Sequence, residues 1–284
     1  MVFHRDASLE RDFGRILRVV VLQTEASTGT PGGGDERLLD AEVLAFKVLQ
    51  HAMSVLVLYR GASLEDLGFK TPYRDLFSIL GLARMCHESY VLFHHIFVAQ
   101  ISEEEREFRY LAWLYVDARK LARFPTCPEV LKELKEYWTK FADDLIHRLE
   151  DNPVYGALSQ PKKRGIREHL HWPPVDCPTL ARQAGFNELH AFQIYKYLCS
   201  YSHPGGVAIR QAREVAEQGS VREWMENGLK HATIILACLA SDIPTVYPVS
   251  RPVLEVDAEG SRLVGLYASF ARNKSEDYGL KLVE

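Results

Sequence analysis

The fold of this chain is decided by residues 76–100, LFSILGLARMCHESYVLFHHIFVAQ, which are apolar on almost every side of a helix. Pro72 lies a few residues earlier, and a first helical turn tolerates proline. We therefore predict one long helix over residues 72–100. A helix that is apolar nearly all round belongs in the middle of a bundle, so this stretch predicts an all-α fold with the helix at its centre.

More helices are predicted on both sides of it, where apolar residues recur every three or four positions. Two precede it, over residues 7–26 and 35–59, and Gly61 follows the second as a stop signal. Ser102 and Glu105 have the spacing of a capping box at the start of the next helix. The later helices are predicted over residues 102–123, 126–150, 178–184, 187–202 and 220–240, and residues 152–176 are expected to be mostly irregular.

The chain is expected to form one main domain with a smaller segment at each end. Residues 1–34 are predicted to hold an N-terminal helix and a flexible glycine-rich loop. Residues 35–242 are predicted to form an antiparallel helical bundle. Residues 243–284 contain prolines and short Val/Leu stretches such as 262–267. We expect them to form a peripheral tail, as a short hairpin or a loosely docked segment.

Composition narrows the class of protein. The chain has 284 residues, of which 47% are hydrophobic and 25% charged, as is usual for a soluble globular protein. Its net charge of −4 argues against a uniformly basic nucleic-acid coat but allows a local basic patch. The five cysteines are widely spaced and form no Cys-x-x-Cys motif, which favours reduced thiols in the cytoplasm. No apolar run approaches the roughly 20 residues of a membrane span, so no membrane is expected.

Polar side chains interrupt the most hydrophobic helix. Arg84, Glu88 and His95 fall within roughly 40° of each other around it, and His87 flanks them. One interpretation is a solvated face, or an internal ion pair between Arg84 and Glu88. The other is a polar cleft. The histidines of this helix are not spaced to share one ion, so we expect neither a metal nor a cofactor.

A second unusual segment combines tyrosine, serine and histidine at a helix end. Tyr197, Ser200 and His203 follow one another at intervals of three residues. Pro204 disfavours a helical backbone at His203, so the imidazole is predicted at the helix terminus. There it either caps main-chain carbonyls or acts as an acid or base near neutral pH.

These motifs resemble a bacterial all-helical family known only as a domain of unknown function. The shared stretches are Arg84-Met-Cys-His-Glu88, Glu107-Phe-Arg109, and Thr179-Leu-Ala-Arg-Gln-Ala-Gly185 followed by Tyr195 and Tyr197-x-x-Ser200-x-x-His203. A more distant likeness is to HEPN domains, helical bundles that often act as metal-independent ribonucleases. Their motif places an arginine four to six residues before a histidine near a helix end. In this chain no arginine precedes His203 at that spacing, so the likeness implies that Arg84 supplies the cation from another helix. The likeness to HEPN domains also implies that the protein forms a homodimer.

Two hypotheses about function follow. In the first, the protein is a metal-independent ribonuclease of toxin or defence type, with RNA as substrate and an antitoxin or other protein as partner. Its predicted catalytic residues are Arg84, Glu88, Ser200 and His203, and its predicted substrate-binding residues are Tyr197, His87, His95, Lys162, Lys163, Arg164 and Arg167. In the second, it is a non-catalytic interaction or regulatory bundle. A separation of Arg84 and His203 by more than about 10 Å would favour the second hypothesis.

Overall fold

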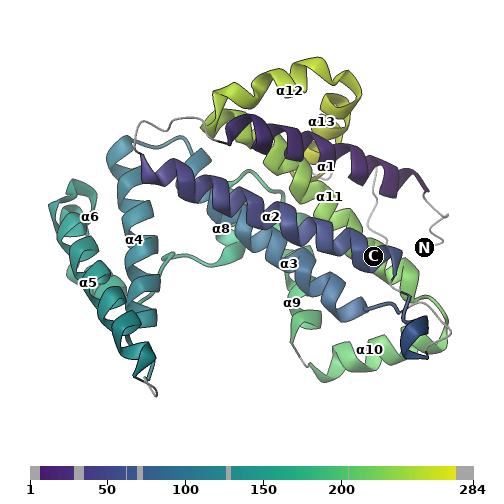
Figure 1. The fold of residues 1–284 in the computed structure, drawn as a ribbon, viewed down its shortest axis with the longest axis horizontal. Coiled ribbons are helices and arrows are strands. Elements are labelled where there is room, and N and C mark those ends of the chain that lie inside the picture. Colours follow the sequence, from purple (N-terminus) through teal and green to yellow (C-terminus); the bar gives the residue numbers. More distant parts are fainter. Residues whose placement is uncertain are drawn as a thin grey trace. The chain divides into compact units, whose positions relative to one another are not determined.

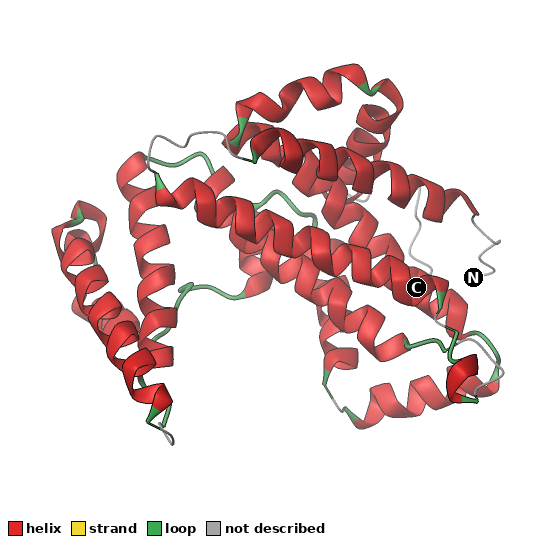
Figure 2. Ribbon diagram, viewed as in Figure 1, coloured by secondary structure: helices red, strands yellow, loops and turns green. Residues whose placement is uncertain are grey.

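The computed structural model describes residues 7–28, 35–61, 63–68, 73–125, 129–203 and 205–272. In this part of the chain there are thirteen α-helices and no strand, which confirms the all-α prediction (Figures 1 and 2). The chain divides into two compact units. We call residues 1–98 with 177–284 the main unit, and residues 99–176 the inserted unit.

The main unit is built around two apolar helices, α3 (Leu76–Phe93) and α11 (Val221–Val246). The two helices pack against each other and are buried along most of their length. Such burial explains why both sequences are apolar on most sides. Helix α3 is central, as predicted, and α11 shares that position. The helices packed around this pair are α1 (Ala7–Ser27), α2 (Glu36–Arg60), α9 (Tyr195–Ser202) and α13 (Ala258–Arg272).

Helix ends in the main unit follow local capping chemistry. The side chain of Asp75 accepts a hydrogen bond from the Ser78 amide, so α3 begins at Leu76 rather than at the predicted Pro72. Pro72 lies outside the described residues. At the other end, residues 94–98 form a π-helical turn. Gly61 ends α2 with a φ of 82°, which confirms the predicted stop.

Shorter elements complete the main unit. Helix α8 (Cys177–Gln183) and a π-helical turn (Leu189–Ile194) precede α9, and α10 (Gly206–Glu217) follows it. Two 3₁₀ turns, at Glu65–Leu67 and Pro248–Ser250, and helix α12 (Arg251–Val256) link longer elements. Most of the predicted glycine-rich loop, residues 29–34, lies outside the described residues.

The C-terminal segment corrects one prediction. Helix α11 continues through Pro244 to Val246, and residues 262–267 lie inside α13 rather than in a hairpin. Helix α13 packs against α1 and α11, and Arg272 at its end pairs with Asp242 at 2.7 Å. The apolar residues of α13 are buried at helical rather than alternating spacing. They are Leu263, Val264, Ala268 and Ala271.

The inserted unit is a pair of packed helices, α4 (Glu103–Ala122) and α5 (Val130–Asp151), with two short helices after them. Ser102 caps α4 by accepting from the Glu105 amide, as predicted. The prediction that residues 152–176 are mostly irregular is wrong, because α6 (Pro153–Ala157) and α7 (Gln160–Arg167) form there. Pro153 and Pro161 stand in first helical turns, where the missing amide hydrogen costs nothing.

Two glycines of α13 test whether the C-terminal segment belongs to the core. A Cβ atom on Gly260 would lie 2.6 Å from Asp257 Oδ2 and 2.8 Å from Val19 Cγ2 of α1, whereas one on Gly265 would meet nothing within 4 Å. We expect Gly260→Ala to lower the free energy of unfolding by about 1–3 kcal/mol through overpacking. Gly265→Ala should instead raise it by about 0.5–1 kcal/mol. Equal effects of the two substitutions in urea denaturation would contradict this packing.

Candidate functional site

The Arg84–Glu88 ion pair of α3 contacts residues at both ends of α9. Arg84 Nε lies 2.8 Å from Glu88 Oε1, and the Tyr195 hydroxyl donates to the same oxygen at 2.9 Å. At the far end of α9, Arg84 Nη1 lies 3.0 Å from His203 Nε2. Arg84 and His203 therefore lie in direct contact, far within the 10 Å that separates the two hypotheses. We call Arg84, Glu88, Tyr195 and His203 the Arg–His cluster.

The contact with Arg84 assigns the tautomer of His203. A guanidinium has only donors, so Nε2 of the imidazole must accept. In this contact the ring proton resides on Nδ1. His203 is exposed, and its extended backbone (φ −122°, ψ 152°) ends α9, in agreement with the predicted helix break. The lone pair of Nε2 is thus held at the protein surface beside a cation.

The Arg84–Glu88 pair is half-buried. The side chains are 21% and 38% exposed, respectively. Burial lowers the pKa of the Arg84 guanidinium, but the Glu88 carboxylate together with Cys199 and Tyr195 raises it, so the pKa lies above its ordinary value. Arg84 therefore stays charged, with a surface open to an anion and a carboxylate that fixes its plane.

Two thiols adjoin the Tyr195 hydroxyl. Cys177 begins α8 and Cys199 lies on α9, and both interact with the Tyr195 side chain. Burial, together with the charge of Glu88, raises the pKa of Cys177 to about 12, so this thiol is protonated at neutral pH and a poor nucleophile. Burial likewise raises the pKa of Tyr195. Tyr195 therefore acts as a hydrogen-bond donor that orients Glu88.

The other predicted site residues of the main unit lie outside the Arg–His cluster, and of these His87 contacts the Tyr195 ring. Ser200 is exposed, and its hydroxyl donates to the Tyr197 carbonyl at 2.7 Å within α9. Tyr197 packs against Tyr201 and Trp224, and burial raises its pKa to about 12. The histidines predicted to bind substrate are placed in the interior. They are His87 on α3 and His95 in the π-helical turn.

A group of buried histidines lies behind Tyr195. The His87 ring stacks on His231 at 5.2 Å between centroids and lies 5.3 Å from the Tyr195 ring, and His190 is 6.4 Å from His231. Burial lowers the pKa of His87 to about 3 and of His190 to about 4, and holds that of His231 well below its ordinary value. These three rings, the buried histidine cluster, are neutral at pH 7.

The structure also shows contributors that the sequence did not indicate. His190 and His231 carry no motif and come from segments distant from α3 along the chain. Only their placement against α3 identifies them. Among the described residues, no group of three or more His, Cys, Asp or Glu side chains is arranged to hold a metal ion.

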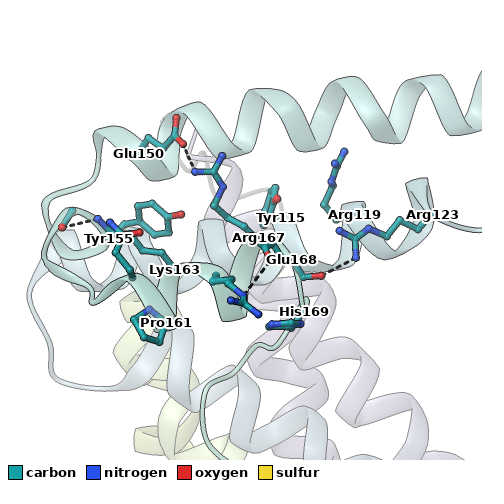
Figure 3. A pocket seen from close by; sticks show the side chains of 13 residues that line it. Tyr115, Arg119, Arg123, Glu150, Tyr155, Pro161, Lys163, Arg167, Glu168 and His169 are labelled. Atoms are coloured by element: carbon teal, nitrogen blue, oxygen red, sulfur yellow. Dashed lines mark hydrogen bonds and ion pairs between the residues drawn. The ribbon is translucent and has the colours of Figure 1, made fainter.

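The inserted unit contains a basic pocket of about 1000 Å³ (Figure 3). Three of the four cations predicted to bind substrate line it, namely Lys163, Arg164 and Arg167, whereas Lys162 is exposed on α7 and does not. Its opposite wall comes from the C-terminal part of α4, which the sequence did not suggest. The residues of this wall are Tyr115 and Arg119 of α4 and Arg123 directly after it.

Two cations of the basic pocket are held by uncharged partners. Arg123 donates to the Glu168 carbonyl at 2.9 Å, and Lys163 donates to the Gly156 carbonyl at 2.8 Å. A carbonyl has no formal charge, so both positive charges persist at the pocket wall. The other three cations face carboxylates, in the pairs Arg119–Asp143, Arg164–Glu168 and Arg167–Glu150. The pocket therefore favours an anion.

Comparison of the chain with models of known protein families, with curated proteins and with solved structures finds no match. The chemistry of this protein must therefore be inferred from its own residues.

The buried histidine cluster predicts a loss of stability in mild acid. These histidines take up protons near pH 6.5 when unfolded but resist protonation when folded, so lowering the pH favours unfolding. Stability should be complete above pH 6.5 and fall between pH 6.5 and 4, by up to about 1.4 kcal/mol per histidine for each pH unit.

Urea denaturation across this pH range measures that loss. His231→Gln should reduce the slope of the free energy of unfolding against pH by the amount expected for about one proton. Substitution of the exposed His147 by Gln should leave this slope unchanged. If His231→Gln and the wild type show the same slope, the buried histidines are not the cause.

Proposed function

We propose that this protein is a metal-independent ribonuclease of toxin or defence type that acts in the bacterial cytoplasm at Arg84 and His203. The 3.0 Å contact between the Arg84 guanidinium and His203 Nε2 carries the proposal. It joins a group that binds phosphate with a group that moves a proton. The likeness to the HEPN motif needs such an arginine beside the histidine, and here it comes from another helix.

The proposed reaction is attack of a ribose 2′-hydroxyl on its neighbouring phosphorus. When a phosphate enters, Arg84 turns its donors to the phosphate oxygens and releases Nε2 of His203. Nε2 then takes the proton of the 2′-hydroxyl as the new phosphorus–oxygen bond forms, and Arg84 neutralises the charge that develops. The 5′-oxygen leaves and takes a proton from water, which gives a 2′,3′-cyclic phosphate and a 5′-hydroxyl.

Glu88 and Tyr195 would serve as positioning residues in this reaction. Glu88 holds the Arg84 guanidinium at 2.8 Å, and Tyr195 holds Glu88. Cys177 is protonated by virtue of its raised pKa and would take no part as a nucleophile. Ser200 is exposed one turn before His203, where it can contact the sugar of a bound strand.

In the inserted unit, the basic pocket is proposed to bind phosphates of the RNA strand. Its cations suit this role, because Arg123 and Lys163 keep uncompensated charge at the wall. Its aromatic residues suit base stacking less well, since Tyr115 and Tyr155 are 5% and 2% exposed. Binding there should therefore depend on charge rather than on base identity.

Cleavage of labelled RNA pools in the presence of a chelator tests the proposed reaction. His203→Ala should lower the rate by about 100-fold or more and leave the melting temperature nearly unchanged, because His203 is exposed. Arg84→Lys keeps the charge but loses the planar fork, and should also slow cleavage. His147→Ala, on an exposed histidine of α5, is the matched control.

Two outcomes would count against the ribonuclease. Equal cleavage by wild type and His203→Ala would assign the activity to a contaminant or another site. Absence of cleavage by wild type across RNA types would favour the non-catalytic bundle, in which Arg84 and Glu88 only hold α9 against α3.

Neighbouring lysines of α7 allow a matched test of RNA binding. Lys163 lines the basic pocket and Lys162 does not. Lys163→Gln should weaken binding of a single-stranded oligoribonucleotide and reduce the slope of log affinity against log salt by about 0.7. Lys162→Gln should change both quantities less. Indistinguishable effects in fluorescence anisotropy would show that general surface charge, not the pocket, binds the strand.

A further inference from the structure

The outward face of α2 carries a continuous row of exposed apolar side chains. The opposite face of α2 packs against α1, α3 and α11, which accounts for only half of its apolar residues. On the outward face, five large apolar side chains are between 46% and 66% exposed. They are Leu39 (60%), Val43 (66%), Phe46 (46%), Met53 (46%) and Val57 (62%). We call these five, with the exposed Gln50 among them, the α2 stripe.

The spacing of the α2 stripe is that of a coiled-coil seam. Its positions 39, 43, 46, 50, 53 and 57 alternate steps of four and three residues, an average period of 3.5. The same alternation extends one step in each direction, to Glu36 at the start of α2 and Arg60 at its end. The stripe itself is about 27 Å long at 1.5 Å per residue. A row of this length suits a second helix laid alongside it.

The order of residues along the seam selects the direction of that second helix. The intervals between stripe positions are the same when the helix is read from either end. In an antiparallel pair of α2 helices, each stripe residue therefore lies opposite a stripe residue of the second copy. Leu39 would face Val57 of the second copy, and Val43 would face Met53 of the second copy. In the middle, Phe46 would face Gln50 of the second copy. All these pairs occur in one register, with a twofold axis at the centre of the seam.

Charge at the two ends favours the same arrangement. In the antiparallel register Glu36 would face Arg60 of the second copy at both ends of the seam. In a parallel pair, Glu36 would face Glu36 and Arg60 would face Arg60, which places like charges together. Arg60 is 61% exposed and can face a second copy, although its Nε also donates to Glu10 of α1. The charges complement each other only when the copies run in opposite directions.

A membrane is the less suitable occupant. By length and composition both α2 and α11 could cross a membrane, but 72% of the apolar window of α11 is buried in the main unit. Helix α2 is buried along one face and apolar only in a stripe on the other. A spanning helix presents apolar side chains all round. An apolar seam with a charged residue at each end suits a second copy of α2 better than it suits a lipid bilayer.

We propose that two copies of this chain associate through an antiparallel pairing of their α2 helices along the α2 stripe. The proposal stands on the exposure, spacing and charge order of α2, and it does not depend on the proposed ribonuclease activity.

Cross-linking of full-length single-cysteine additions tests the register. Val43→Cys and Met53→Cys are prepared with tags of different size, mixed and oxidised. The antiparallel pairing places residue 43 of one copy opposite residue 53 of the other, so the mixture should give the mixed disulfide dimer. Each variant alone should give none at this site, because residues 43 and 43 would lie about 15 Å apart along the axis, beyond disulfide reach. Wild type measures the background from the native cysteines.

Sedimentation velocity over a concentration series tests the association itself. Wild type should sediment as a dimer, and Val43→Asp should shift the dimer dissociation constant upward by at least tenfold. Val43 is largely exposed, so at concentrations at which both proteins are monomeric the melting curve of Val43→Asp should match that of wild type. Ser54→Asp, on an exposed residue of α2 outside the stripe, is the matched control and should leave the dimer intact.

Several results would overturn the proposal. One is a monomeric wild type at all concentrations, which would leave the α2 stripe to another segment of the same chain. Another is monomeric wild type that floats with phospholipid vesicles, which would assign the stripe to a membrane. Self-cross-linking of Val43→Cys alone would indicate a parallel pair and would also contradict the assigned register.

Discussion

The Arg84–Glu88 ion pair is the interaction on which the surroundings of the site depend. A charged pair on a helix that is otherwise buried needs partners that satisfy its remaining donors and acceptors. Helix α9 supplies them at both of its ends, through Tyr195 to Glu88 and through His203 to Arg84. Because Glu88 meets the start of α9 and Arg84 meets its end, α9 runs antiparallel to α3. The same contacts bring the imidazole to the surface beside a cation.

Behind this polar layer, the titratable groups next to the Tyr195 ring are uncharged. The buried histidine cluster and the Cys177 thiol are held neutral by burial. Because the histidines behind the Tyr195 ring are neutral, the charge beside Tyr195 lies at the half-buried Arg84–Glu88 pair, where an entering anion would meet one oriented guanidinium. Stability and the geometry of the Arg–His cluster are therefore linked, because His87 packs on the Tyr195 ring that holds Glu88.

The sequence was sufficient where a local rule governs the structure. The all-α fold follows from the apolar periodicity of α3, and the His203 break follows from the proline after it. Local rules gave wrong predictions where packing against other segments determines whether a stretch of residues forms a helix. Pro153 and Pro161 begin helices instead of interrupting them, and the apolar residues of 262–267 belong to a helix on α1 and α11. The secondary structure of such a segment depends on the helices that pack against it. A short window of sequence carries no information about those helices.

The candidate site was predicted in part for the same reason. Arg84, Glu88 and His203 stood out because a charge on an apolar helix and a histidine before proline are each unusual. His190 and His231 did not, since a histidine on a mixed helix is ordinary until its neighbours are known. The α4 wall of the basic pocket was missed because about 40 residues separate Arg123 from Lys163 along the chain. Long-range proximity of this kind requires the fold.

The most direct test of the account is the tautomer of His203, observed by long-range ¹H–¹⁵N correlation spectra of the histidine rings above neutral pH. His203→Gln identifies the signals by their loss. The account predicts an unprotonated Nε2 and a protonated Nδ1 in wild type, because Arg84 donates to Nε2. It also predicts that Arg84→Ala shifts the Nε2 signal. A protonated Nε2 in wild type, or spectra of His203 that are unchanged by Arg84→Ala, would contradict the contact from which the proposed chemistry is derived.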